Sequence, residues 1–255
     1  MAMFERTAIL AAVITVAFAA HTGADAQEVP VDLELVLATD VSASIDKEEA
    51  SLQRAGYLAA LTSKEVIDAI RTGVLGRIAI TYIEWAGAQN TVVDWTVIED
   101  LASARAFATA LRSAPLTSGA ATSISGALDY SARLFDDNGF DGTRRVIDIS
   151  GDGRNYSGRP LIFARADVLA QGITINALPM IHYDQDGQIL NPGLDTYYSQ
   201  RVVGGPGAFM VPALGTNAFP DAILKKLIIE ISGLDSPAEY DVVSRSPDKS
   251  LPQTK

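Results

Sequence analysis

Three short polar turns carry the side chains of this sequence that are best suited to chemistry. The first, Asp40-Val41-Ser42-Ala43-Ser44, follows an apolar run and bears one carboxylate and two hydroxyls. The second contains Thr122 at the start of a helical segment, and the third places Asp152 between two glycines after another apolar run. All of their donor atoms are oxygens, which suit a hard divalent cation such as Mg²⁺ or Ca²⁺ better than Zn²⁺ or copper. These turns therefore predict a cation site, provided that the fold brings them together.

The surrounding elements alternate between strands and helices. The strand over 31–40 leads directly into a helix over 47–62, for which Asp46 and Glu49 form a predicted capping box. Further strands are predicted over 77–85, 91–98, 144–150, 173–179 and 208–212, and further helices over 64–71, 101–113, 122–135, 160–171, 196–202 and 217–232.

This order predicts an α/β fold. We expect a doubly wound, mostly parallel central sheet with helices on both faces, a three-layer sandwich of the Rossmann-like kind. The short gap before the strand over 91–98 favours a hairpin, so that strand is predicted to be the one antiparallel edge. In such a sheet ligands bind beyond the carboxyl ends of the strands, where the strand order reverses.

Composition limits the classes of partner. The 255 residues carry a net charge of −11 without a run of Lys or Arg, which argues against nucleic acid and anionic membranes as partners. The sequence has no cysteine, so disulfides and thiol chemistry are excluded. A hydrophobic content of 48% is that of an ordinary globular protein with a substantial core.

The first 26 residues have the pattern of a secretory signal peptide. Arg6 precedes an apolar run over 8–20, and Ala24-Asp25-Ala26 has the small-x-small form of a cleavage site. An uncleaved anchor is the alternative, which the short apolar run disfavours. We expect a signal peptide over 1–26, a single domain over 27–243 and a flexible tail over 244–255. The mature protein would have no membrane-spanning segment and would be exported, to the periplasm of a Gram-negative bacterium or into the medium.

The three polar turns together resemble the von Willebrand factor A (VWA) domain family, and most closely its exported bacterial branch of unknown function (DUF1194-like). The resemblance covers about 31–232. It implies a metal-ion-dependent adhesion site (MIDAS) in which Ser42 and Ser44 bind the cation directly and Thr122 supplies a third hydroxyl. Asp40 and Asp152 would hold metal-bound waters, or one of them would coordinate the ion. The implied ion is Mg²⁺, with Ca²⁺ and Mn²⁺ as alternatives, and a partner's carboxylate would complete its coordination.

One position departs from the family pattern. Gly151 separates Ser150 from Asp152, where the family commonly has Thr-Asp-Gly or Ser-Asp-Gly, so a looser turn is predicted. Asp148 is a second carboxylate in the same strand, which strand alternation can turn to the other face.

Each candidate residue also has a purely structural interpretation. Ser44, Asp46 and Thr122 are good helix caps, and Asp-Gly is a common turn pair. Several other polar or aromatic residues are expected to be structural: His182 in a surface loop, Asp184-Gln185-Asp186-Gly187 as a simple turn, Trp85 and Trp95 in packing, and Arg144 and Arg145 in solvent.

The leading functional hypothesis is an exported, non-enzymatic module that binds a protein partner presenting an acidic side chain on a divalent cation. The first alternative is a hydrolase with Asp40 or a serine as nucleophile, although Gly-x-Ser-x-Gly and a second Asp after Asp40 are both missing. The second alternative is a metal-free periplasmic scaffold or solute-binding protein.

Overall fold

A six-stranded sheet organises residues 28–233, which are the part of the chain that the computed structural model describes. Its strands lie in the order β4-β3-β2-β6-β7-β8, and only β4 runs antiparallel to its neighbour. The strands are β2 (Leu33–Asp40), β3 (Ile78–Trp85), β4 (Gln89–Ile98), β6 (Arg145–Gly151), β7 (Thr174–Ile181) and β8 (Ala213–Leu214). The predicted signal peptide over 1–26 and the predicted tail over 244–255 lie outside the described residues.

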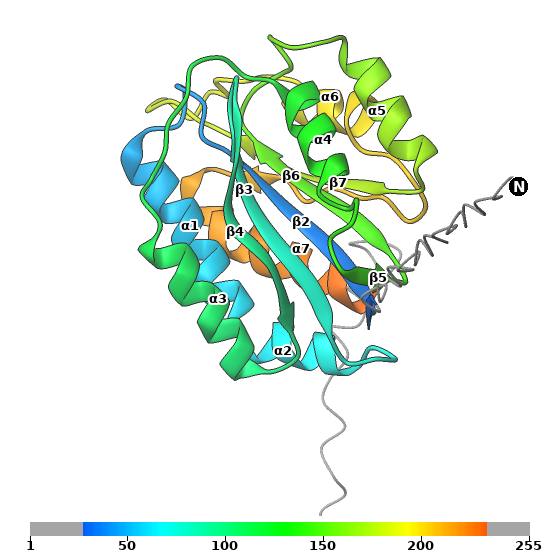
Figure 1. The fold of residues 1–255 in the computed structure, drawn as a ribbon. Helices are drawn as coiled ribbons and strands as arrows, with labels where there is room; N and C mark the ends of the chain where they lie inside the picture. The colour runs from blue at the N-terminus through cyan, green and yellow to red at the C-terminus, as the bar shows by residue number, and fades with distance from the viewer. Residues whose placement is uncertain (1–27, 234–255) are drawn as a thin grey trace, which may run out of the picture.

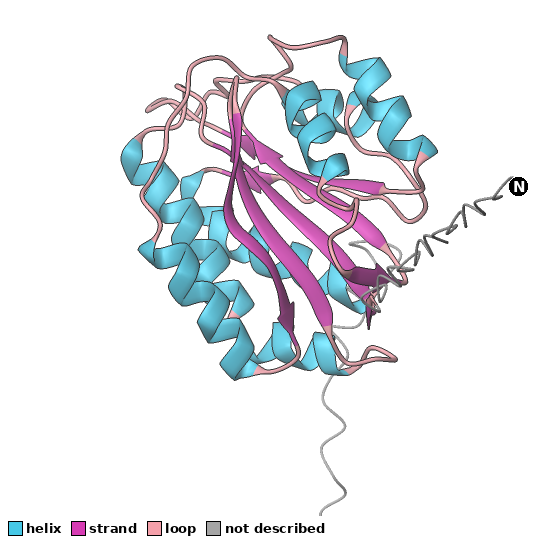
Figure 2. Cartoon of the chain, viewed as in Figure 1, coloured by secondary structure: helices cyan, strands magenta, loops and turns pink. Residues whose placement is uncertain are grey.

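Helices cover both faces of this sheet (Figures 1 and 2). One face carries α1 (Lys47–Leu61), α2 (Lys64–Arg71), α3 (Leu101–Ser113) and α7 (Phe219–Ser232), the last preceded by a 3-10 turn over Thr216–Ala218. The other face carries α4 (Ile124–Arg133), α5 (Leu161–Ala170) and α6 (Leu194–Arg201). The doubly wound α/β architecture with one antiparallel edge strand is therefore confirmed. Among residues 28–233, no helix combines the length and the hydrophobicity needed to cross a bilayer.

Strand alternation divides the core into two layers. Leu35 and Leu37 of β2 pack with the α1–α7 side, whereas Val36 and Ala38 pack with the α4–α6 side. All eight residues of β2 are buried, as expected for a central strand with helices on both faces. This burial fixes the register of β2 and hence the position of the turn that follows it.

The sequence did not predict a small second sheet. β1 (Val29–Val31) pairs in parallel with β5 (Phe140–Gly142), and the Glu34 carboxylate accepts a 2.8 Å hydrogen bond from the Gly142 backbone N–H. The predicted strand over 208–212 is also wrong, because its Met210 forms only an isolated bridge with Ala177 and β8 begins at Ala213. Strands of two or three residues are too short to show a periodicity.

A buried ionic cluster joins β6 to α7. Lys226 Nζ lies 2.6 Å from Asp148 Oδ1 and also donates to Glu230, and all three side chains are almost fully buried. Burial raises the pKa of Asp148 and raises that of Glu230 to about 7, while the ammonium lowers both. Asp148 therefore faces away from the candidate metal centre. Arg144 was expected to lie in solvent, but its guanidinium instead donates to the carbonyls of Glu230 and Ile231 at the end of α7.

The strand order reverses beside β2. After β2 the chain builds outwards to β3 and β4, and it then returns to place β6 on the opposite side of β2. In open α/β sheets the crevice at such a switch point, beyond the carboxyl ends of the strands, is the usual ligand site. In this protein the switch point lies between β2 and β6, so the residues just beyond Asp40, the last residue of β2, and Gly151, the last residue of β6, lie at this crevice.

Candidate metal centre

The first polar turn is held tightly against the end of β2. Asp40 Oδ1 accepts a 2.8 Å hydrogen bond from the Ser42 backbone N–H, and the Val41 N–H continues the ladder by donating to the Trp85 carbonyl. Asp46, rather than Ser44, is the N-cap of α1 and accepts from the Glu49 N–H at 2.9 Å. The Ser44 side chain is therefore not used as a helix cap.

The structure brings the first and third turns together. Ser44 Oγ donates to Asp152 Oδ1 at 2.8 Å, although the two residues are 108 positions apart, and it lies 3.3 Å from Ser42 Oγ. Ser42 and Asp152 are buried, whereas Ser44 is exposed. These contacts give a continuous chain of hydrogen bonds from Asp40 behind the first turn, through Ser42 and Ser44, to Asp152 in the third turn.

The second turn lies beside the third. The Thr122 carbonyl accepts hydrogen bonds from the backbone N–H groups of Tyr156 and Ser157, at 2.9 and 3.0 Å. Ser123, not Thr122, caps α4 by accepting from the Gly126 N–H. Thr122 is half-buried, and its side chain lines the same cavity as Ser44 and Asp152. The helix-cap interpretation of Thr122 is therefore wrong, and the residue forms part of the wall of this cavity.

Gly151 does not loosen the turn after β6, contrary to the sequence-based prediction. It is buried as the last residue of β6 and is paired with Pro179 of β7. A Cβ at this position would lie 2.7 Å from the Tyr198 hydroxyl and 2.9 Å from Asp40 Oδ2, both closer than van der Waals contact. Glycine thus lets β6 approach Asp40 closely, and the approach delivers Asp152 to the rim of the site.

The negative charge of Asp40 is the one that burial in this site makes most costly. Its side chain is fully buried, and Oδ2 has no hydrogen-bond partner among the described residues. Burial, with a smaller contribution from the negative charge of Asp152, raises the pKa of Asp40 from 3.8 to about 7. A buried carboxylate with an unpartnered oxygen is costly unless a cation or a proton neutralises it. This orphaned oxygen, together with the neighbouring hydroxyls, fits an oxygen-ligated divalent cation.

His182 and Glu49 are two residues of this region that the sequence analysis missed. His182 follows β7 directly, and its Nε2 lies 3.5 Å from both Asp152 Oδ2 and Glu49 Oε1. With 21% of its side chain exposed, His182 is not the surface-loop residue that was predicted. Contact with Asp152, and secondarily the charge of Glu49, raises the pKa of His182. Glu49 therefore faces His182 instead of completing the predicted capping box.

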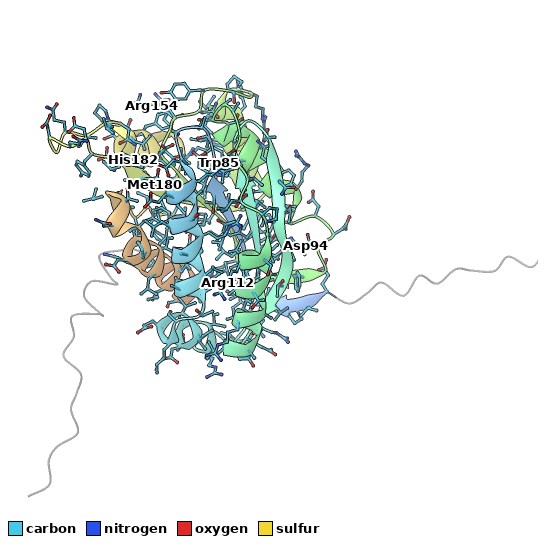
Figure 3. The ribbon with its side chains drawn as sticks, turned by 90° about the vertical axis from the view of Figure 1, so that its left-hand side faces the viewer. Trp85, Asp94, Arg112, Arg154, Met180 and His182 are labelled. Atoms are coloured by element: carbon cyan, nitrogen blue, oxygen red, sulfur yellow. The ribbon has the colours of Figure 1, made fainter. Side chains whose placement is uncertain are left out.

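A cavity of about 590 Å³ opens over these residues, and its wall includes Ser44, Thr122, Asp152, Tyr156 and His182. Figure 3 shows His182 towards the same end of the molecule as Trp85, the last residue of β3. Within residues 28–233 no group of three or more His, Cys, Asp or Glu side chains is arranged to hold a metal ion. Any cation at this rim would therefore depend on hydroxyl ligands.

The remaining residues that the sequence singled out are structural. Asp184 Oδ1 accepts from the backbone N–H groups of Asp186 and Gln188, which makes the predicted simple turn. Trp85 is fully buried, and Trp95 packs against Phe135. Arg145 donates to the Gln171 carbonyl.

The comparisons with known proteins identify the fold class. The structure resembles BatB from Bacteroides thetaiotaomicron (TM-score 0.53, 21% identity), with 79% of this chain and 99% of that chain covered. It also resembles a von Willebrand factor type A protein from Catenulispora acidiphila (TM-score 0.51, 14% identity, 79% and 42% covered). Proximal thread matrix protein 1 from the mussel byssus, whose MIDAS motif is zinc-occupied in one structure, gives a TM-score of 0.60 at 15% identity.

That last match covers 80% of this chain and 49% of the mussel chain, so the present chain spans about half the length of that protein. These likenesses define a VWA-like α/β module. Within that class, the chain belongs to the DUF1194 family of proteins of unknown function, which matches residues 30–235. No curated protein matches the sequence.

Proposed function

We propose that this protein is an exported, non-enzymatic binding module that captures an acidic side chain of a partner protein on a divalent cation. The ligand set is Asp40, Ser42, Ser44, Thr122 and Asp152, and the cation is Mg²⁺, with Ca²⁺ or Mn²⁺ as alternatives. The observation that carries the proposal is the chain of hydrogen bonds from Asp40 through Ser42 and Ser44 to Asp152, which joins two turns 108 residues apart.

The chemistry of the donor set favours binding over catalysis. Ser42, Ser44 and Thr122 are neutral, so a cation held here would keep much of its charge for an incoming carboxylate. The chain's own residues orient this set: the Ser42 N–H fixes Asp40, and Ser44 fixes Asp152. No described contact places His182 against either serine, as a hydrolase using a serine nucleophile would require.

The likeness to other modules supports the proposal further. One mussel structure has zinc at its MIDAS motif, and a pilus adhesin from Lactobacillus rhamnosus GG shares the fold (TM-score 0.57, 15% identity, 79% of this chain and 31% of that chain covered). The signal-peptide pattern over 1–26 supports an exported, periplasmic location. A cation-dependent site suits this compartment, where Mg²⁺ and Ca²⁺ are available.

The test is calorimetric titration of the purified mature protein with Mg²⁺ and Mn²⁺. We expect saturable binding by the natural sequence and none by Asp40→Ala, with both proteins folded by circular dichroism. An Asp46→Asn variant is the matched control, because it removes one carboxylate but leaves a good N-cap on α1. Equal metal binding by Asp40→Ala would refute the ligand set, and indifference of the natural protein to both metal and EDTA would favour the metal-free scaffold.

A further inference from the structure

A hollow of about 600 Å³ between α5 and α6 is lined by three arginines and by no acidic residue. The arginines are Arg154, Arg165 and Arg201, and the lining also includes Ile162 and Tyr197. We call this hollow the arginine groove. Three cationic side chains around one hollow contrast with the net charge of −11 of the whole sequence. They create a local positive field within a surface that is otherwise acidic.

The charges of the arginine groove are not neutralised within the described part of the chain. None of the three arginines forms an ion pair with a carboxylate of residues 28–233, whereas Arg54 and Arg159 elsewhere do. Arg165 donates to the Val203 carbonyl at 2.7 Å, so a neutral group holds it in place. The guanidinium of Arg154 lies 5.2 Å from the centre of the Tyr197 ring. These contacts position Arg154 and Arg165, and because they involve no carboxylate they leave the positive charge available to an external anion.

The arginine groove adjoins the candidate metal centre through Arg154. Arg154 also lines a smaller hollow whose wall includes Asp152 and Gly153. That hollow shares Tyr156 and Leu190 with the cavity over the metal centre. Figure 3 shows Arg154 and His182 towards the same end of the molecule. A single extended ligand can therefore run from the metal centre into the groove without leaving the surface.

Apolar side chains lie along the same path. Tyr156 is 77% exposed, and Leu190 and Ile162 are each 64% exposed. Exposed apolar groups beside cationic groups match a ligand that combines apolar and anionic side chains, as a protein segment does. A free inorganic anion would use the arginines alone.

We propose that the arginine groove binds an acidic, extended segment of a partner protein, and that the carboxylate bound at the candidate metal centre belongs to the same segment. This proposal rests on the proposed function. The metal centre accepts one carboxylate of the segment, and the groove selects segments whose neighbouring residues are also acidic. Such electrostatic complementarity contributes to specificity and to the rate of association.

The experiment uses a short fluorescein-labelled peptide in which glutamates alternate with leucines and glycines, and a matched peptide with glutamines. Fluorescence anisotropy is measured with the mature protein in Mg²⁺ and in EDTA. We expect the glutamate peptide to bind in Mg²⁺, and the double variant Arg154→Gln/Arg201→Gln to bind it about tenfold more weakly. The control variant Lys64→Gln/Arg71→Gln removes the same charge from the exposed ends of α2 and should bind as the natural protein does.

The outcomes separate the groove from the metal centre. Weaker binding in the groove variant together with loss in EDTA supports both sites, whereas weaker binding in the groove variant without any EDTA effect supports the groove and refutes the metal dependence. Loss in EDTA with unchanged affinity in the groove variant overturns the groove. Failure of the natural protein to bind the glutamate peptide also overturns it. Arginine-dependent binding to phosphatidylglycerol vesicles without peptide binding would assign the groove to lipid headgroups instead.

Discussion

Replacing Asp40 by Asn should stabilise the metal-free protein while abolishing its affinity for divalent cations. Asn keeps the oxygen that accepts from the Ser42 N–H and removes the negative charge. That charge is fully buried, and Oδ2 has no partner among the described residues. The residue that we place at the centre of the ligand set is therefore also one that the metal-free fold accommodates badly.

The magnitude follows from the pKa. The pKa of Asp40 is raised from 3.8 to about 7, chiefly by burial. The native state therefore keeps a proton that the unfolded chain releases, and raising the pH between about 4 and 7 favours unfolding. Since one pKa unit corresponds to about 1.4 kcal/mol, the ionisation of Asp40 should cost the natural protein about 4 kcal/mol of stability across this range. The Asn variant should lack this contribution and keep only the loss due to other groups with a raised pKa, such as Glu230. Its advantage over the natural protein should stay constant above pH 7.

The assay is urea denaturation in EDTA at pH 5 and pH 8, followed by circular dichroism. Asp46→Asn again serves as the control, because it makes the same chemical change at an exposed helix cap. In parallel, millimolar Mg²⁺ should raise the melting temperature of the natural protein, since a ligand of the native state stabilises it, and should leave Asp40→Asn unchanged. The reasoning is refuted if Asp40→Asn in EDTA at pH 8 is no more stable than the natural protein.

Three further substitutions, with Lys64→Met as a control, test other parts of the structure. Lys226→Met should destabilise the fold by about 3 to 5 kcal/mol at pH 8, because two buried carboxylates lose their counter-charge, and by less at pH 5, where Glu230, whose pKa is about 7, is protonated. Lys64→Met, which breaks an exposed ion pair, should change little in the same urea assay. Gly151→Ala should cost about 1 to 3 kcal/mol through overpacking and should weaken cation binding. Ser44→Ala should weaken Mg²⁺ binding in calorimetry with a stability change below about 1 kcal/mol.

Each of these predictions would be contradicted by a specific result. Equal losses for Lys226→Met and Lys64→Met would show that the buried cluster contributes nothing specific. A fully stable Gly151→Ala that binds Mg²⁺ normally would mean that β6 does not need its close approach to Asp40. Unchanged Mg²⁺ affinity in Ser44→Ala would remove that hydroxyl from the ligand set.

Elements with a clear period or a strong boundary signal were predictable from the sequence. The helix over 64–71 has the same bounds as α2, because Ser63 caps it and its apolar residues keep one face. The hairpin edge β4 followed from the short gap after β3. The convergence of the first and third turns was also predictable, because β2 and β6 are neighbouring parallel strands that end at the same edge.

The surroundings of the site were less predictable. His182 lies beside Asp152 because β7 continues to Ile181, two residues beyond the predicted end of that strand. Glu49 has the spacing of a capping residue, so no local signal indicated that it faces His182. The arginine groove combines α5, α6 and the loop after β6, and such a combination has no signature in one segment of sequence. These features depend on long-range packing, which sequence patterns do not encode.

The buried cluster of Asp148, Lys226 and Glu230 also determines the alignment of β6. A slip of β6 by one residue would turn Asp148 into the apolar layer of α4 and α5 and would present Ile147 or Ile149 to the ammonium of Lys226. Both changes would bury a charge without its counter-charge, which costs too much free energy in the protein interior. The strand therefore has a single stable register. That register is the one in which the chain emerges at Asp152 beside Ser44, and an ion pair on the far side of the sheet thereby sets the spacing of oxygens at its rim.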